Sequence, residues 1–84
     1  MHEETMLRAK AIALAILRIR LGLCQEQIAA RLGVQQSTVS RWEHGRRVPQ
    51  IAIEDYAAAL QVPAAQVDHI VELLLPDLGV SPCQ

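Results

Sequence analysis

Residues Gln25 to Glu43 read QEQIAARLGVQQSTVSRWE, and this stretch decides the fold. Its apolar side chains recur at the three- or four-residue spacing of helices that each bury one face. They are Ile28, Leu32, Val34, Val39 and Trp42. Ala29 is small enough for two helices to cross closely, and Gly33 adopts positive φ at low cost. The pattern predicts two short helices joined at a steep angle by a turn of about three to four residues, a helix-turn-helix.

The second of these predicted helices has a polar outer face. At about 100° per residue, five residues fall opposite Val39 and Trp42. They are Gln36, Ser37, Ser40, Arg41 and His44. A helix-turn-helix usually places its second helix in the major groove of DNA, and a compact polar face suits contact with base edges. The alternative is an ordinary helical hairpin whose outer face is merely solvated.

The length of 84 residues fits one small domain. We expect residues 1–76 to form this domain, with the helix-turn-helix unit at about 25–44, and residues 77–84 to form a loose tail. The chain is 51% hydrophobic but has no Phe, so its core must be aliphatic. Cys24 and Cys83 lack metal-ligand or CxxC spacing, which favours free thiols in a reducing cytoplasm. The apolar run 11–17 is too short to span a membrane.

The two halves of the chain differ in charge. Residues 1–47 carry eight basic and four acidic groups, a balance of +4. Residues 48–84 carry five acidic groups and no Lys or Arg, a balance of −5, and the two sum to the net charge of −1. This distribution favours contact of the first half with phosphate, while the low total charge should limit non-specific binding.

Helical periodicity and turn residues predict an all-α chain. We expect helices at about 5–21, 25–32, 36–44, 51–60 and 64–75, with no strand. Leu7, Leu14, Leu17 and Leu21 should form the core-facing stripe of the first helix. Cys24 stands where a Ser or Thr cap would be expected, so the cap of the helix over 25–32 should be weak.

From Leu17 to about Val67 the chain resembles the Cro and phage-repressor family, also called Xre-like. The resemblance is carried by residues in the family's order and spacing, namely Arg18, the Gly22–Leu23 turn, Gln25, Ala29, Gly33, Glu43, Gly45 and Pro49. It implies a five-helix, lambda-repressor-like DNA-binding domain, here with an extended C-terminal helix. Its partners would be double-stranded DNA and a second copy of the chain, with no cofactor and no metal.

The resemblance also implies roles for individual residues. Gln25 matches a glutamine that binds a DNA phosphate and braces the glutamine matched by Gln36. The positions of Ser37, Ser40 and Arg41 carry base contacts in the family. Arg46 and Arg47 match a loop that touches the DNA backbone, and Gln35 is expected to contact phosphate as well. Arg18 and Glu43 match a structural ion pair.

The chemistry of these side chains leaves some alternatives open. Gln36 suits a bidentate contact to adenine N6 and N7, or is a solvated glutamine. Arg41 suits either guanine or a phosphate, and the two serines suit a thymine methyl group or a water. Arg46 and Arg47 contact phosphate or form a solvated loop. His44 lies near a helix end, where a dipole interaction explains it better than base reading.

Two apolar surfaces exceed what one core needs. Ile12, Ile16 and Ile19 form a stripe opposite the leucines of the first helix, and the last helix is apolar on more than one face. We expect this last helix and the start of the tail to pack on the back of the first helix, within or between protomers. The predicted dimer or partner surface comprises Ile12, Ile16, Ile19, Ile70, Leu74 and Leu78. A two-fold dimer would set two recognition helices about 34–36 Å apart.

These observations predict a sequence-specific DNA-binding regulator, a homodimeric repressor in the cytoplasm associated with the nucleoid. The alternatives are the antitoxin of a toxin–antitoxin pair, which also holds a protein partner, and an interaction adaptor that does not bind DNA. No nucleophile–base pair, carboxylate pair or phosphate-binding glycine loop is visible in the sequence, so no enzyme is predicted. Cys24 is read either as a redox switch at a helix N-terminus or as a tolerated cysteine.

Overall fold

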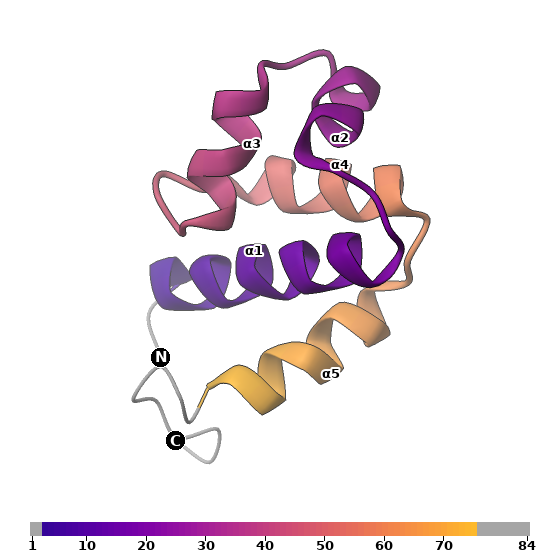
Figure 1. Cartoon of the computed structure of the whole chain (residues 1–84). Coiled ribbons are helices and arrows are strands. Elements are labelled where there is room, and N and C mark those ends of the chain that lie inside the picture. Colours follow the sequence, from indigo (N-terminus) through magenta and orange to yellow (C-terminus); the bar gives the residue numbers. More distant parts are fainter. Residues whose placement is uncertain (1–2, 76–84) are drawn as a thin grey trace.

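The computed structural model describes residues 3–75, and all of its regular structure is helical (Figure 1). Its helices are α1 (Glu3–Arg20), α2 (Gln25–Leu32), α3 (Gln36–Glu43), α4 (Gln50–Leu60) and α5 (Ala64–Leu74). The predicted all-α class and the five helices are therefore confirmed, and each predicted boundary lies within two residues of the observed one. The predicted tail, with Leu78 and Cys83, lies outside the described residues.

The long helix α1 lies at the centre of the arrangement. Helices α3 and α4 pack against it on one side, and α5 packs against it on the other (Figure 1). Helix α2 packs on α3 and α4 and completes the layer that faces away from α5. The expectation that the last helix covers the back of the first is thus met within a single chain. It also means that α3 and α5 lie on opposite sides of α1.

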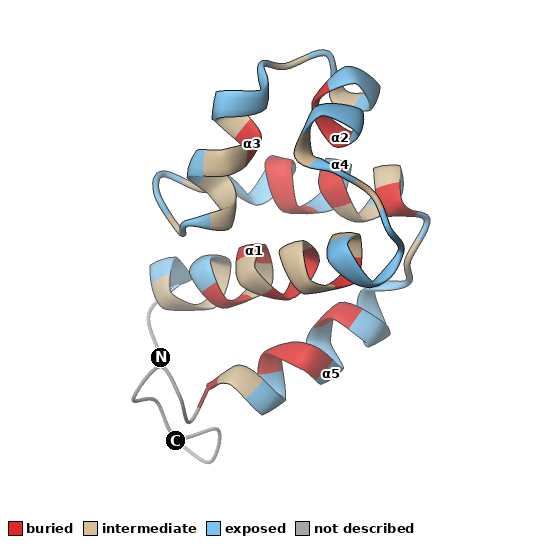
Figure 2. Cartoon of the chain, viewed as in Figure 1, coloured by how far each residue is buried: buried red, intermediate tan, exposed pale blue. Residues whose placement is uncertain are grey.

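The core is aliphatic apart from Tyr56 and lies on the faces that the helices turn toward one another (Figure 2). Leu14 and Leu17 are buried as expected, at 0% and 2% exposure. Leu21 is not, because α1 ends at Arg20 and leaves Leu21 in the following turn, where it is 53% exposed. Three alanines of α1 that were not part of the predicted stripe are also buried, Ala9, Ala11 and Ala13. Their small side chains allow helices to approach α1 closely from two sides.

Cys24 is the N-cap of α2, as predicted, and Gln27 adds a hydrogen bond there that the sequence analysis did not foresee. The backbone amide of Cys24 donates to Gln27 Oε1 at 2.8 Å. A side chain that reaches back from the third helical position satisfies a backbone donor that has no partner within the helix. Gln27 therefore supports a helix start at which Cys24 replaces the usual hydroxyl residue.

Between residues 3 and 75, no helix has the length and apolar character that crossing a membrane requires. The same part of the chain contains no cluster of His, Cys, Asp and Glu side chains that could hold a metal ion. Cys24 is exposed there as a free thiol.

Candidate nucleic-acid interface

The turn between α2 and α3 sets the angle of the helix-turn-helix. Gly33 has φ +69°, in the left-handed region, and the amide of Val34 donates to the carbonyl of Ala29 at 3.0 Å. This backbone hydrogen bond ends α2 and redirects the chain into α3. Ile28 and Val39 are both 0% exposed, so the two helices share one buried seam. The predicted motif is therefore present, with α3 in the place of the recognition helix.

The outer face of α3 is open to solvent. Gln36, Ser37 and Arg41 are exposed, and Ser40 is half-buried. Arg41 and Ser37 make only long, local contacts, since Arg41 Nη2 lies 3.4 Å from Thr38 Oγ1 and Ser37 Oγ lies 3.5 Å from Gln35 Oε1. The structure thus brings the four predicted base-reading residues onto one accessible surface, where Ser37 and Arg41 can exchange their local contacts for contacts with DNA.

A shallow groove of about 270 Å³ follows the C-terminal half of α3. It is lined by Ser40, Arg41, His44 and Arg46. His44 Nδ1 lies 2.7 Å from the carbonyl oxygen of Ser40, and a carbonyl can only accept, so Nδ1 carries the proton. This bond is the second that the Ser40 carbonyl accepts, after the one from the backbone amide of His44, and it places the imidazole at the end of α3, where a dipole interaction was expected. Two arginines and a hydroxyl make the groove suitable for a phosphate oxygen.

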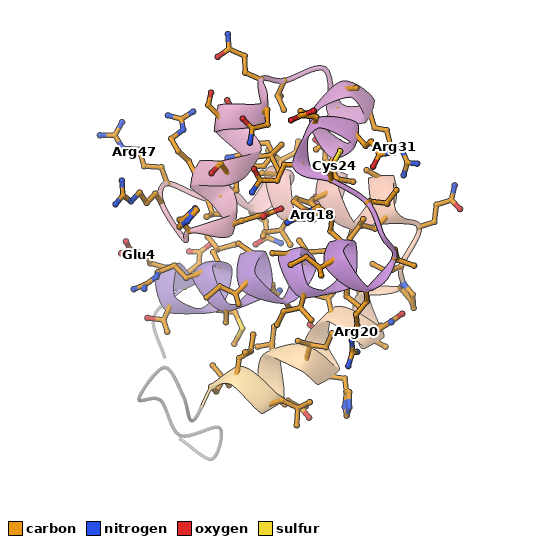
Figure 3. The ribbon with its side chains drawn as sticks, in the orientation of Figure 1. Glu4, Arg18, Arg20, Cys24, Arg31 and Arg47 are labelled. Carbon is orange, nitrogen blue, oxygen red and sulfur yellow. The ribbon has the colours of Figure 1, made fainter. Side chains whose placement is uncertain are left out.

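The basic loop after α3 divides its two arginines between two surfaces. Arg46 lines the groove beside Arg41, whereas Arg47 lines a second groove of about 510 Å³ that also contains Glu3, Glu4 and Arg8. Both loop arginines are exposed, and Figure 3 shows Arg47 pointing outward from the loop. The two residues therefore do not form a single anion site. Arg46 lies closer to the base-reading surface, while Arg47 faces a region of mixed charge.

A bidentate ion pair joins α1 to the end of α3. Arg18 Nε donates to Glu43 Oε2 at 2.8 Å, and Arg18 Nη2 donates to Glu43 Oε1 at 3.0 Å. Arg18 Nη1 donates to the carbonyl of Leu23 at 2.8 Å. The two side chains are only 12% and 6% exposed, and Arg18 lies in the middle of the molecule in Figure 3. This pair therefore ties together α1, the turn before α2, and α3.

Gln25 connects the ion pair to the surface of the recognition helix. Its Nε2 donates to Glu43 Oε1 at 2.8 Å, and its Oε1 accepts a hydrogen bond from Gln36 Nε2. Gln25 is half-buried at the start of α2, whereas Gln36 is exposed at the start of α3. A continuous line of hydrogen bonds thus runs from the interior to a predicted base-reading side chain.

Tyr56 of α4 is a member of this network that the sequence did not reveal. Its hydroxyl donates to Glu43 Oε2, and its side chain is 2% exposed. The sequence placed it only among the apolar residues of its helix. A usable signal was present, because a buried tyrosine hydroxyl needs a hydrogen-bond partner. Burial is the main cause that raises the pKa of Tyr56, and the hydrogen bond to Glu43 raises it further. The hydroxyl therefore keeps its proton and acts as the donor.

The charge state of Glu43 follows from these contacts. Burial raises the pKa of Glu43, but hydrogen bonds from Arg18, Tyr56 and Gln25 outweigh it and hold that pKa below its ordinary value of 4.5. The hydrogen bond to Glu43 likewise raises the pKa of Arg18. The carboxylate is therefore ionised at neutral pH, and each of its oxygens accepts two hydrogen bonds.

The residues predicted to form a dimer or partner surface are dispersed. Ile70 is 6% exposed and belongs to the core of the single chain, where it packs in the layer between α5 and α1. Ile16 and Leu74 are partly buried against the same core. Ile12 is half-buried, and Ile19 is the exposed member at 64%. Leu73, which was not assigned to that surface, is 65% exposed.

Comparison with known families supports this reading of the geometry. Residues 11–70 match the model of the helix-turn-helix domain family, and this span includes α2, α3, α4 and most of α1 and α5. The chain belongs to the helix-turn-helix domain family. Neither a curated protein nor a solved structure matches the chain. Membership in this family indicates a DNA-binding regulator, a class that is typically non-enzymatic.

Proposed function

We propose that the protein is a sequence-specific DNA-binding regulator that inserts α3 into the major groove. One observation carries this proposal: the exposed polar face of α3 begins with Gln36, whose amide is held by Gln25. A side chain that is already oriented before binding loses less conformational freedom when it contacts a base. Gln36, Ser37, Ser40 and Arg41 would face the base edges, with Gln36 suited to adenine and Arg41 to guanine.

Phosphate contacts would come from residues at the edges of this face. Gln25 and Gln35 lie at the starts of α2 and α3, and Arg46 lies in the groove beside Arg41. Arg47 is exposed on the same loop and would reach the backbone from the other side. Such contacts fix the position of a protein on the duplex, whereas the base contacts supply the sequence preference.

The proposed assembly is a homodimer that acts as a repressor on a two-fold operator in the cytoplasm, associated with the nucleoid. The exposed apolar side chains of Ile19 on α1 and Leu73 on α5 support a protein-binding role for these two helices. Because α5 lies on the far side of α1 from the recognition helix, a second copy bound there would leave α3 free (Figure 1). Two-fold dimers of this kind read two half-sites about one DNA turn apart.

Selection of bound sites from a random DNA pool, followed by binding at several salt concentrations, tests the proposal. Gln36→Ala should weaken binding to the selected site by about 1–3 kcal/mol and relax the preference at one base pair. Arg46→Ala should weaken binding to all sequences about equally and reduce the salt slope by about one.

Arg20→Ala provides the matched control for the loss of a basic residue. Arg20 is exposed at the end of α1, on the side that faces α5 (Figure 3). Its removal should leave both the selected site and the salt slope close to those of the parent. The proposed function would be overturned if the parent chain selected no DNA sequence at low salt, at any concentration at which it is folded.

A further inference from the structure

In the hydrogen-bond network behind the recognition helix, the donors and acceptors follow a fixed order from the interior to the surface. Glu43 occupies its inner end, Gln25 its middle and Gln36 its outer end. An amide side chain can present either its oxygen or its nitrogen to a neighbour, so neither glutamine has an orientation of its own. The orientation of both must be set by a group that acts only as a donor or only as an acceptor.

Glu43 is such a group. An ionised carboxylate only accepts, and it has about four lone-pair positions on its two oxygens. Arg18 fills one position on each oxygen, Tyr56 fills the second on Oε2, and Gln25 Nε2 fills the second on Oε1. Gln25 must therefore turn its nitrogen toward Glu43 and its oxygen toward α3. That oxygen requires a donor, so Gln36 must turn its nitrogen toward Gln25.

This orientation fixes what Gln36 presents to DNA. Its Nε2 keeps one free N–H next to Gln25, and its Oε1 lies on the other side of the amide. In the major groove adenine offers the N6 donor and the N7 acceptor side by side, and an amide oxygen and N–H match them in one orientation only. The reverse orientation of the network would exchange the donor and the acceptor positions over the same base edge.

We propose that Glu43 is a specificity-determining residue that acts at a distance: its carboxylate sets the orientation of Gln25 and thereby decides which end of the Gln36 amide faces each base atom. The inference rests on the proposed function, because it concerns the base that α3 reads. Glu43 itself is 6% exposed and has no access to DNA, so it is a positioning residue. An amide at position 43 would offer Gln25 either an oxygen or a nitrogen, and both orientations of the network would then be populated.

The experiment compares Glu43→Gln with Tyr56→Phe by selection from a random DNA pool, at a temperature where circular dichroism shows each variant to be folded. Tyr56 contacts only Oε2, whereas Gln25 contacts Oε1. Tyr56→Phe therefore removes a hydrogen bond from the same carboxylate, at a cost in stability, without changing the orientation of Gln25. Glu43→Gln should reduce the preference at the base pair read by Gln36 about fivefold or more, the lower end of what one bidentate contact discriminates. Tyr56→Phe should keep that preference.

Gln25→Met supplies a second variant that leaves the Arg18–Glu43 pair intact. It should relax the sequence preference at the same base pair as Glu43→Gln, while the preference at the base pair read by Arg41 stays as in the parent.

Gln36→Ala identifies the base pair concerned. If Gln36→Ala changes no position, the base-reading assignment of the proposed function is wrong and this inference fails with it. If Gln36→Ala relaxes one position, the inference alone is overturned when Gln25→Met keeps that preference or when Tyr56→Phe relaxes it as much as Glu43→Gln does.

Discussion

The side chain of Arg8 fills the space into which a side chain at Gly45 would project. A Cβ added to Gly45 would lie 3.0 Å from Arg8 Nε and 3.1 Å from Arg8 Cγ. Gly45 also has φ +74°, which L-residues with a Cβ rarely adopt. Arg8 of α1 therefore lies beside the loop after α3, and its side chain limits what position 45 can hold.

Gly45→Ala should therefore destabilise the fold more than Gly33→Ala does. Both glycines have similar positive φ, and a Cβ in the left-handed region costs about 1–2 kcal/mol. A Cβ at Gly33, however, would meet no atom within 4 Å. The difference between the two variants in thermal unfolding measures the clash with Arg8. Equal losses, or a difference that persists in an Arg8→Ala background, would show that the contact does not restrict the loop.

The Arg18–Glu43 ion pair should contribute strongly to stability. Removing one partner of a buried pair leaves an uncompensated charge, which costs about 3–5 kcal/mol. Arg18→Met and Glu43→Gln should each lower the free energy of unfolding on this scale, measured by urea or thermal denaturation. The double variant should lose less than the sum of the two single losses, because neither charge is left behind. Melting temperatures within a degree or two of the parent would contradict this prediction.

Acid should weaken the fold through Glu43. Its pKa is lower in the folded chain than the ordinary value of 4.5, so the unfolded chain takes up this proton first as the pH falls. The stability that Glu43 contributes is complete above about pH 4.5 and is lost as the pH falls through the folded-state pKa. The free energy of unfolding, measured from pH 7 downward, should fall more steeply in the parent than in Glu43→Gln. Parallel curves for the two proteins would be inconsistent with a lowered pKa.

The proposed homodimer predicts a specific pair of outcomes in sedimentation. The parent should dimerise at high micromolar concentration, and Ile19→Glu should shift the equilibrium toward monomer. Ile51→Glu is the matched control, because Ile51 is 65% exposed and Ile19 is 64% exposed, but Ile51 lies on α4. Ile16→Glu is less informative, since Ile16 packs partly against the core. A monomeric parent, or an equal effect of Ile19→Glu and Ile51→Glu, would remove the surface on α1 from the proposal.

Periodicity predicted the helix-turn-helix well because its signals are local. Ile28 and Val39 are buried at the spacing of one helix face, and Gly33 has the positive φ that the turn requires. Leu21 was predicted wrongly because the helical repeat was extended past the end of α1 at Arg20. A stripe of leucines gives no sign of where the hydrogen bonds of the helix stop.

The contacts behind α3 depend on tertiary geometry, which periodicity does not contain. Resemblance to a known family supplied the pairing of Arg18 with Glu43 and of Gln25 with Gln36. The link from Gln25 to Glu43 arises only when α2 packs on α3, and the bond from Tyr56 arises only when α4 brings its hydroxyl to Glu43. Likewise, the burial of Ile70 reflects how α5 packs on α1, whereas the sequence could show only that the residue is apolar.

Trp42 gives this protein a built-in optical probe. It is the chain's one tryptophan, it is partly buried against the core, and it immediately precedes Glu43 on α3. Its fluorescence therefore reports from a single known place, next to the carboxylate that joins the interior to the recognition helix. Emission spectra recorded without any attached dye can follow unfolding and can register repacking at the end of α3 when DNA is added.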